Sequence, residues 1–397
     1  MKIPGTRQTI SEDDVQAIVD AMHDPLLTTG PRVEEFENAF AKATDSRFAV
    51  AVNSGTAALH AAMHACGIGT DESAVAALDE VIVPAISFVA TSNVALYQNA
   101  KPVFADVEAD TLRIDVRDVE QKITANTKAI VAMDYGGQPC DYASLRAIAD
   151  RHQLMLVADA CHSLGGSVGV RAVGALADCS CFSLHPAKQI TAGEGGMITT
   201  DDQDLATAMR AFRNHGIGSN HRQRQKQATH RYTMEALGYN YRLTDIQCAL
   251  GISQLRKLHE FTRLRNEVAA VYDDLLCGCE FLTPLTTVRG VRHARHLYVV
   301  KWNAESSGIT RDEAFGRLRE RGIGVNVHYQ PIYQQPYYQR QIASKSIDAP
   351  WCPVADEVYQ SILSLPVFPG MTLEQISYVV ESLHEVVTGA ELLRRVA

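Results

Sequence analysis

One lysine of this chain, Lys188, occupies a position in the sequence at which its amine could act as a nucleophile. An apolar run at residues 179–184 predicts a buried strand before it, and a glycine-rich turn follows, before a second β-prone run at 197–200. A lysine in such a place can lose its hydration, which lowers its pKa and frees the amine as a nucleophile. The glycines let the backbone come close to a flat ligand. This stretch alone is equally typical of a surface lysine in a hairpin.

A carboxylate and an aromatic ring also follow expected strands. Asp159 ends the apolar run 154–159, and Phe88 comes shortly after the run 80–84. Asp159 could cap the segment that follows it, which is the common role of such a residue. It could instead hold a proton on the ring nitrogen of a pyridine, with Phe88 stacked on the same ring.

A phosphate site is expected where the strand 47–52 runs through Ser54, Gly55 and Thr56 into an alanine-rich helix. The first N–H groups of a helix lack partners and lie at the positive end of its dipole, although any helix can begin in this way. Ser183, at the end of the strand 179–184, could add a hydroxyl. Phosphate site, aromatic ring, carboxylate and lysine, in that order along the chain, suit pyridoxal phosphate (PLP). The lysine would form a Schiff base, and the carboxylate would keep the pyridinium as an electron sink.

Apolar strands that alternate with helices are expected to position these residues. Such alternation implies a mainly parallel α/β sheet, in which ligands bind at the carboxyl ends of the strands. The expected strands are 47–52, 80–84, 102–107, 128–135, 154–159, 179–184 and 197–200, and the expected helices include 11–23, 32–42, 141–151 and 204–214.

The second part of the chain has a different pattern of expected helices and strands. We predict a large PLP-binding domain at 12–250 and a smaller α+β domain at 251–397, with residues 1–11 as an N-terminal arm. A long helix is expected from 244 to about 272, and strands near 296–301 and 323–329. The basic, polar segment 215–231 is interpreted as a solvated linker or as an anion-binding flap.

Composition excludes several classes of function. The net charge of −9 over 397 residues argues against nucleic acid or an anionic membrane as the main partner. The sequence has neither an apolar run of membrane-spanning length nor a signal-peptide core. Nine scattered cysteines are typical of reduced thiols in the cytoplasm, and no spacing indicates a metal site.

Six segments resemble the DegT/DnrJ family of PLP-dependent nucleotide-sugar aminotransferases, of fold type I, and the resemblance covers nearly the whole chain. They are residues 53–59, 87–91, 159–165, 182–196, 213–216 and 238–250. The resemblance implies that Lys188 forms the Schiff base, that Asp159 pairs with the pyridine nitrogen and that Phe88 stacks on the ring.

The same resemblance implies further cofactor contacts. Gly55, Thr56 and Ser183 match phosphate contacts, and His162 falls near the ring hydroxyl of the cofactor, where many relatives carry glutamine. Asn240 matches an asparagine that reaches the phosphate from the other subunit. This implies a homodimer with shared active sites, the commonest kind of oligomer in any case.

Three segments, 133–137, 161–165 and 327–333, resemble the family members that act in pseudaminic acid biosynthesis. Those enzymes move an amino group from L-glutamate to position 4 of a UDP-4-keto-6-deoxy-N-acetylhexosamine. The implied substrate contacts are Leu26, Leu27, Thr28, Arg242, His328, Tyr329, Gln330 and Pro331. One position departs from the pattern, because Gly5 stands where an aromatic sugar contact is expected.

Three alternatives stay open at this point. The acceptor could be another 4-keto sugar nucleotide of the perosamine type, which would use the same cofactor machinery. Family dehydratases carry histidine at the lysine position, so Lys188 argues against that activity. A PLP-binding regulator without turnover is the third, although no segment resembles a DNA-binding module and the acidic balance opposes one.

Overall fold

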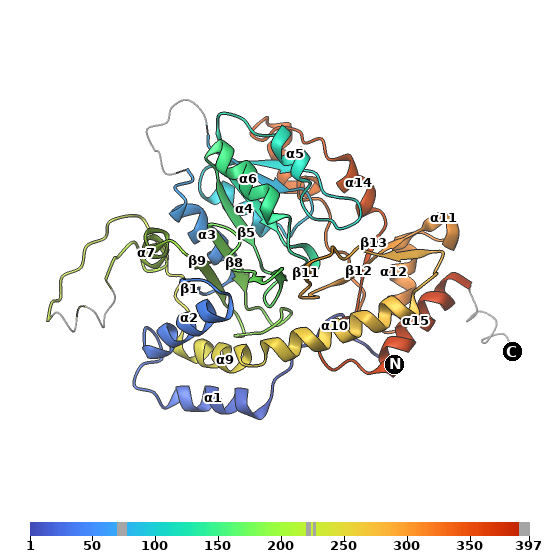
Figure 1. Ribbon diagram of the computed structural model, residues 1–397, viewed down its shortest axis with the longest axis horizontal. Helices are drawn as coiled ribbons and strands as arrows, with labels where there is room; N and C mark the ends of the chain where they lie inside the picture. The colour runs from blue at the N-terminus through green and yellow to red at the C-terminus, as the bar shows by residue number, and fades with distance from the viewer. Residues whose placement is uncertain (70–77, 220–223, 225–227, 389–397) are drawn as a thin grey trace.

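The computed structural model describes residues 1–69, 78–219, 224 and 228–388, and its centre is a seven-stranded sheet (Figure 1). In the order in which they lie side by side, the strands are β1 (Phe48–Val52), β9 (Gly196–Thr200), β8 (Cys179–Ser183), β5 (Met155–Asp159), β4 (Thr127–Met133), β2 (Glu80–Pro84) and β3 (Lys101–Ala105). Within this sheet β9 alone runs against its neighbours β1 and β8. The other strands therefore end at one edge, which confirms the predicted mainly parallel α/β sheet.

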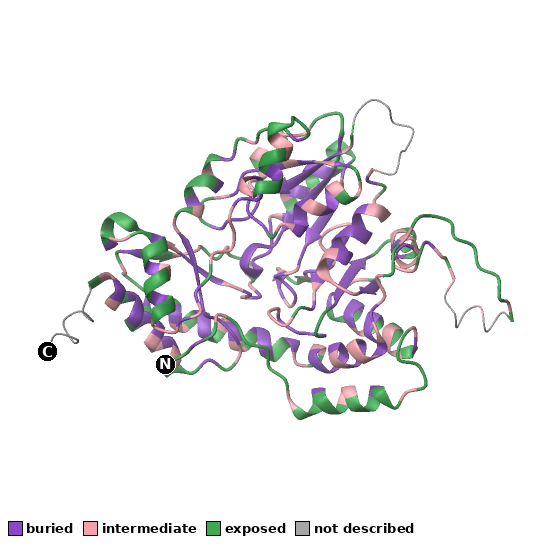
Figure 2. Ribbon diagram, turned by 180° about the vertical axis from the view of Figure 1, so that it is seen from behind, coloured by how far each residue is buried: buried purple, intermediate pink, exposed green. Residues whose placement is uncertain are grey.

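Alternating side chains give this sheet two apolar faces. In β1, for example, Val50 and Val52 point into one core while Ala49 and Ala51 point into the other. The first face is covered by α3 (Gly55–Ala65), α4 (Ala90–Tyr97) and α7 (Gln203–Phe212). The second is covered by α2 (Pro31–Ala43), α5 (Val116–Gln121), α6 (Tyr142–His152) and α9 (Asp245–Leu255). Figure 2 shows the sheet buried between these layers, as a parallel sheet requires.

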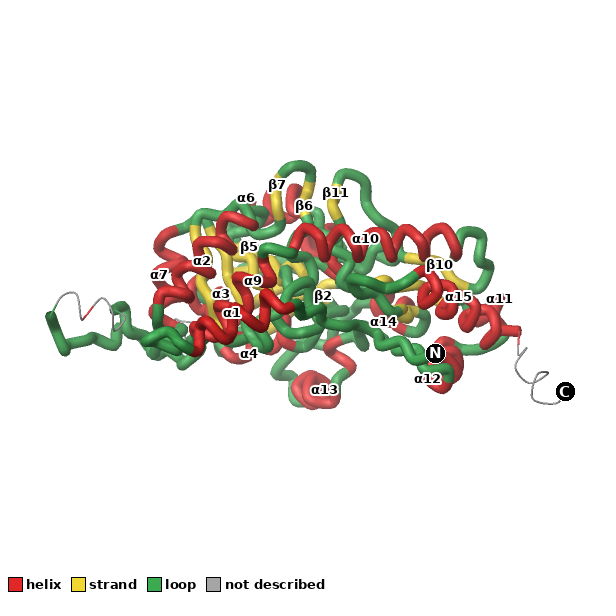
Figure 3. The backbone as a smooth tube through the Cα atoms, turned by 90° about the horizontal axis from the view of Figure 1, so that it is seen from below, coloured by secondary structure: helices red, strands yellow, loops and turns green. Residues whose placement is uncertain are grey.

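A second core forms around a small antiparallel sheet of β10 (Leu282–Pro284), β12 (Tyr298–Trp302) and β13 (Ile362–Leu365). It is packed by α10 (Leu258–Leu275), α12 (Arg311–Glu320) and α15 (Leu373–Thr388), and the N-terminal Ile3 is part of it. Helix α10 leads from one core to the other, because Leu258 and Phe261 pack with the large sheet and Val268 and Tyr272 with the small one (Figures 1 and 3). The domain boundary predicted after residue 250 stays a prediction.

Several further elements complete the described part of the chain. They are α1 (Glu12–Met22), which packs on α9, η1 (Tyr135–Gly137), η2 (Ile332–Gln334), α11 (Ala304–Ser307), α13 (Pro336–Ala343), α14 (Pro353–Tyr359) and the three-stranded sheet β11 (Val291–Arg292), β6 (Ser167–Val168) and β7 (Arg171–Ala172). No helix of the described residues is long and apolar enough to cross a membrane.

Two of the predicted elements of secondary structure are wrong. The single helix expected from 244 to about 272 is broken between α9 and α10 at Arg256 and Lys257, although the apolar periodicity continues across the break. The strand expected at 323–329 forms only isolated bridges at Ile323 and Asn326, because its partners there are the N-terminal residue Ile3 and the single residue Ser364. The small sheet takes its third strand instead from β13, which the sequence did not indicate.

The described residues of the segment between α7 and α9 extend away from the body of the molecule at the left of Figure 1. Part of the predicted linker 215–231 lies outside the described residues. In the described part, Ile217 pairs with Met234, and the backbone N–H of Glu235 donates to the Gly216 carbonyl at 2.9 Å.

Candidate active site

The carboxyl edge of the large sheet brings three predicted residues together. Gly55 follows β1, Asp159 ends β5 and Ser183 ends β8. A Cβ atom added to Gly55 would lie 2.9 Å from the Ser183 Cβ and 3.2 Å from the Cys161 Sγ, so Gly55 packs against both Ser183 and Cys161. The parallel register of β5 and β8, in which Asp159 pairs with Cys181, places their ends at the same level.

The first turn of α3 is open for an anion. Ser54 caps this helix, because its hydroxyl accepts the N–H of Ala57 at 3.0 Å and its carbonyl accepts that of Ala58. Among the described residues the N–H groups of Gly55 and Thr56 have no partner, and they lie at the positive end of the helix dipole. Gly196 packs so tightly behind the cap that a side chain there would overlap the Ser54 carbonyl.

Asp159 is a buried carboxylate that no cation of the described chain pairs with directly. It accepts the Thr91 hydroxyl at 2.6 Å and the Cys161 N–H at 3.2 Å. Thr91 is itself fully buried and lies 2.6 Å from the Ser87 hydroxyl. A buried charge is costly unless it is paired, so this site suits a ligand that carries a protonated nitrogen.

Lys188 lies in the loop between β8 and β9, partly buried beside Asp159 and Cys161. Its N–H donates to the His185 carbonyl at 2.9 Å, and its own carbonyl accepts a hydrogen bond from the buried Arg265 at 3.4 Å. None of the described residues hydrogen-bonds to its amine. Loss of hydration lowers the pKa of Lys188, although the negative charges near it act in the opposite direction.

His162 is buried next to this lysine. Its Nε2 lies 3.2 Å from the Tyr329 hydroxyl, its carbonyl accepts a hydrogen bond from Gln189, and its Nδ1 has no partner. The ring of His296 packs against it with 4.2 Å between centroids. Burial, together with the nearby Lys188 and His328, holds the pKa of His162 well below its usual range, so its ring is neutral.

Phe88 lies at the same edge of the large sheet, and 54% of its surface is exposed. Its ring lies 6.1 Å from that of Tyr329, at an angle of 57°. An aromatic face so exposed beside buried polar groups can stack on a planar ligand.

A buried scaffold holds the turn at 134–140, next to His162. Asp134 accepts hydrogen bonds from Ser163, Tyr142 and the N–H of Cys140, at 2.6, 2.9 and 2.8 Å, and burial raises its pKa to about 6.

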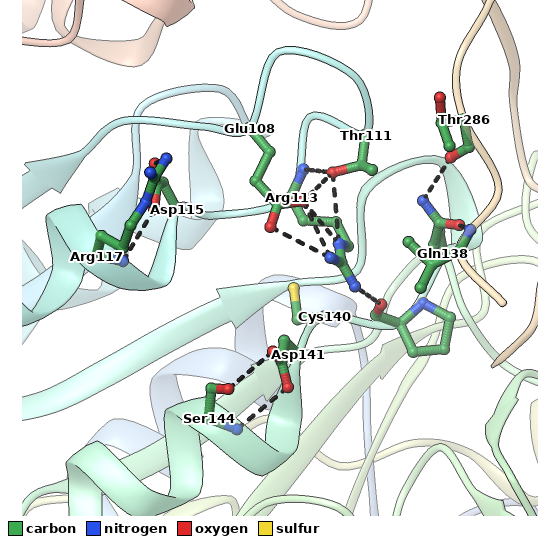
Figure 4. A network of polar contacts seen from close by, with 12 residues as sticks. Glu108, Thr111, Arg113, Asp115, Arg117, Gln138, Cys140, Asp141, Ser144 and Thr286 are labelled. Carbon is green, nitrogen blue, oxygen red and sulfur yellow. Dashed lines mark hydrogen bonds and ion pairs between the residues drawn. The ribbon is translucent and has the colours of Figure 1, made fainter. Parts of the chain in front are cut away.

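The same turn is tied to its neighbours by the contacts in Figure 4. Arg113 pairs with Glu108 at 3.0 Å and donates to the Pro139 carbonyl, while the Gln138 amide donates to the Thr286 carbonyl at 3.1 Å. The N–H of Asp134 also donates to the Asp159 carbonyl at 3.1 Å, so this scaffold supports the end of β5 as well as Ser163, which lies next to His162 in the chain.

Two predicted substrate residues lie at the lysine. His328 is held by Ser364 at 2.8 Å and by Asn326 at 3.2 Å, and burial together with Lys188 lowers its pKa to about 4. Tyr329 contacts His162, as described above. Gln330 bonds to Gln334 and Gln335, and Pro331 precedes η2, so these two lie just beyond.

The other predicted contacts form a separate group. Thr28 pairs with Thr244, the carbonyl of Leu27 accepts the N–H of Asp245, and both Leu27 and Leu26 are exposed. Arg242 donates to Asn214 at 2.9 Å, and Asn240, which is exposed, pairs with the same Asn214. No contact in the described chain joins this group to Lys188 or Asp159. Their predicted roles stay predictions.

The structure explains the departure at Gly5. A side chain at this position would overlap the carbonyl oxygen of Gly324, and the N–H of Gly324 bonds to the carbonyl of Ile3 at 2.7 Å. An aromatic residue is therefore excluded by the path of the N-terminal strand-like segment.

Sequence reasoning did not single out Thr91 or His296 as functional. Both are buried in contact with predicted site residues, but an isolated threonine in a helix and a histidine before a strand form no local pattern. Within the described ranges, no group of three or more His, Cys, Asp and Glu residues could hold a metal ion.

Comparison with known proteins decides the family. Residues 8–384 match the model of the DegT/DnrJ/EryC1/StrS aminotransferase family. The chain belongs to this family. The predicted family resemblance and the predicted fold type I are thereby confirmed, and this DegT/DnrJ protein is a PLP-dependent aminotransferase.

Among its relatives, the spore coat polysaccharide biosynthesis protein SpsC of Bacillus subtilis is 36% identical over 392 residues, 98% of each chain. PseC of Helicobacter pylori, described as an aminotransferase involved in the biosynthesis of pseudoaminic acid, superposes with a TM-score of 0.89 at 30% identity, over 98% of this chain and 100% of that one. The putative sugar aminotransferase Spr1654 of Streptococcus pneumoniae, solved in its PLP form, gives 0.87 at 26% identity, over 98% and 99%.

The residues of this DegT/DnrJ chain fit the cofactor that its family uses. The partnerless N–H groups of α3 fit a phosphate, the buried carboxylate of Asp159 fits a protonated ring nitrogen, and the desolvated amine of Lys188 fits a covalent bond to an aldehyde.

Proposed function

We propose that this protein transfers the amino group of L-glutamate to position 4 of a UDP-4-keto-6-deoxy-N-acetylhexosamine. The product would be UDP-4-amino-4,6-dideoxy-N-acetyl-β-L-altrosamine, an intermediate of pseudaminic acid biosynthesis. The likeness to PseC supports this acceptor. The observation that carries the amino-transfer chemistry is the desolvated Lys188 beside the buried, unpaired Asp159, at the sheet edge where α3 presents its free N–H groups.

Lys188 is the proposed acid and base. Bound PLP supplies an electron sink for the charge that develops when the α-proton of the donor leaves. The lowered pKa of Lys188 increases the fraction of neutral amine, which takes this proton on Nζ and delivers it to the accepting carbon. Asp159, fixed by Thr91 and by the N–H of Cys161, holds the proton on the ring nitrogen.

The remaining site residues have binding roles in this proposal. Gly55, Thr56 and Ser183 bind the phosphate, Phe88 stacks on the ring and His162 contacts a ring oxygen. The contacts proposed for the nucleotide sugar are Leu26, Leu27, Thr28, Arg242, His328, Tyr329, Gln330 and Pro331.

We further propose a homodimer in which Asn240 completes the phosphate site of its partner. Two observations support this. Asn240 is exposed, and within its own chain it contacts Asn214 and Asn53 rather than Lys188 or Asp159. The described part of the projecting segment exposes Tyr232, Met234 and Leu237 by 62%, 61% and 77%. Exposed apolar side chains of this kind mark a surface that associates.

A mixing experiment tests the shared site. Lys188→Ala and Asn240→Ala proteins, each inactive alone, are unfolded together and refolded. A hybrid dimer contains one site with both wild-type residues, so random pairing restores about a quarter of the wild-type activity. Activity that stays at the level of the separate variants, in a mixture shown to be dimeric, contradicts a shared site.

A cytoplasmic location is part of the same proposal, and the state of the thiols supports it. All nine cysteines are free. A reducing compartment keeps thiols in this state.

The function itself is tested by absorbance spectra of the PLP-loaded protein. L-Glutamate is expected to bleach the visible band of the cofactor, and the UDP-linked keto sugar to restore it, whereas Lys188→Ala responds to neither. Restoration only by a different keto sugar would replace the acceptor. A band that does not respond to any amino donor would favour a PLP-binding protein without turnover, and no band after incubation with PLP would overturn the proposal.

A further inference from the structure

Helix α10 places an arginine behind the main chain of Lys188. Arg265 lies in the middle of this helix, where it passes from the large core to the small one, and 1% of its surface is exposed. Its Nη1 donates to the carbonyls of Val367 at 3.0 Å and of Arg295 at 3.4 Å, and its Nη2 donates to the carbonyl of Lys188 at 3.4 Å. A guanidinium can only donate and a carbonyl can only accept, so the direction of all three hydrogen bonds is fixed.

The positive charge of Arg265 is buried without a counter-charge. Among the described residues no acidic side chain pairs with it, and its Nε has no partner. Burial lowers the pKa of Arg265 to about 10, so the guanidinium stays charged at neutral pH. A buried unpaired cation is costly, and an apolar side chain of similar volume is often as good for stability. The position of the three carbonyls therefore accounts for an arginine here better than stability does.

The three carbonyls belong to segments that meet at the site. Lys188 carries the amine, and Arg295 precedes His296, whose ring packs on that of His162. Arg295 has a left-handed backbone with φ of 49°, a conformation that persists in a residue other than glycine only where its surroundings fix it. Val367 is part of the small core. One guanidinium thus joins the Lys188 loop to the segment before β12 and to the small core.

We propose that Arg265 is a positioning residue, which holds the main chain of Lys188 where its amine can transfer a proton. This inference rests on the proposed function for the reaction of Lys188, whereas the hold on its loop belongs to the chain itself. The planar fork of an arginine reaches carbonyls on two sides at once, which the single ammonium of a lysine does not reproduce. A misplacement of about 1 Å can slow catalysis by about a hundredfold.

Arg265→Met tests the proposal in the PLP-loaded protein, by stopped-flow bleaching at varied concentrations of L-glutamate. The limiting rate is expected to fall by about 10- to 100-fold, because Lys188 is no longer held in place. The glutamate concentration that gives half of this rate is expected to change by less than about twofold, since the hydrogen bonds of Arg265 end on the main chain. An unchanged limiting rate would overturn the proposal.

Arg311→Met is the matched control. Arg311 on α12 is also buried, with 5% of its surface exposed, and its Nη1 donates to the Ile362 carbonyl at 2.8 Å within the small core. This variant is expected to keep the wild-type limiting rate. An equal decrease in both variants would show that loosening of the small core is sufficient to slow the reaction, and the proposal would fail.

Arg265→Lys separates the geometry of the side chain from its charge. It keeps the positive charge and loses the planar fork, so its limiting rate is expected to lie within about threefold of that of Arg265→Met. A wild-type rate in Arg265→Lys would show that the charge matters rather than the hold on three carbonyls, and would overturn the proposal. If Arg265→Met does not fold, Arg265→Lys takes its place in each comparison.

Hydrogen exchange in the cofactor-free protein measures the hold on the loop directly. The N–H of Lys188 donates to the His185 carbonyl at 2.9 Å, so exchange of a peptide that covers residues 184–192 reports how often this loop opens. Arg265→Met is expected to speed this exchange by about tenfold, and Arg311→Met to leave it unchanged. Equal exchange in the wild type and Arg265→Met would overturn the proposal even if the reaction slowed. If the loaded protein responded to no amino donor, the proposed function would fail, and exchange would still decide whether Arg265 holds the loop.

Discussion

Thr91→Val tests whether the geometry of Asp159 matters for the reaction. The substitution keeps the shape of the side chain and removes the hydroxyl that donates to the Asp159 carboxylate at 2.6 Å, inside a fully buried site. A hydrogen bond to a charged group contributes about 1.5–3 kcal/mol. If this contribution is lost from the reacting state, the half-reaction slows by about 10- to 150-fold, at about 1.4 kcal/mol for each factor of ten.

The assay is stopped-flow bleaching of the cofactor band by L-glutamate under single-turnover conditions. Thr199→Val is the matched control, because the Thr199 hydroxyl is equally buried and bonds to the Gly174 carbonyl at 2.9 Å, on a strand of the same sheet. This control is expected to lose about 1 kcal/mol of stability and no activity. A Thr91→Val rate within about twofold of the Thr199→Val rate would refute the argument that Thr91 holds Asp159 in place.

Three other outcomes follow from the site and its surroundings. Asp159→Asn is expected to slow the same half-reaction by orders of magnitude in a protein that stays folded by circular dichroism, and an unchanged rate would leave Asp159 only a structural role. Gly196→Ala pushes a methyl group onto the Ser54 carbonyl, so PLP affinity measured by fluorescence quenching should fall about tenfold or more, whereas Gly316→Ala, which meets open space, should match the wild type. Burial lowers the pKa of His60 from 6.5 to about 4, so the unfolded chain binds a proton in this range that the folded chain does not. The contribution of His60 to the free energy of unfolding is therefore fully present above about pH 6.5 and is lost as the pH falls toward 4. Urea titrations should show a decrease of about 2–3 kcal/mol over this range, and His60→Phe should make the decrease smaller. Equal slopes for the two proteins would contradict it.

The sequence by itself determined the large sheet and the places from which the site is built. The residues Phe48–Val52 form a continuous apolar run, and such a short run is typical of a strand buried on both faces, here with Val50 and Val52 on one face and Ala49 and Ala51 on the other. The local sequence likewise predicts where Gly55, Asp159 and Lys188 lie relative to the strands. They became a site because parallel strands end at one edge.

Local pattern was insufficient where packing decided the outcome. The helical period continues in phase from α9 into α10, so only the observed backbone shows that one helix ends at Arg256 and the next begins after Lys257. Strand β13 has four residues, too few for a clear period, and it becomes a strand because β12 offers it a partner.

Only the tertiary structure decided which side chains meet. Thr91 reaches Asp159 across 68 positions of sequence, and Tyr329 reaches His162 across 167. Such contacts depend on how loops close between distant elements, and no propensity or period of the intervening residues encodes them. The residue types needed for the chemistry can be recognised in the chain, but the hydrogen bonds that fix their geometry exist only once the fold has formed.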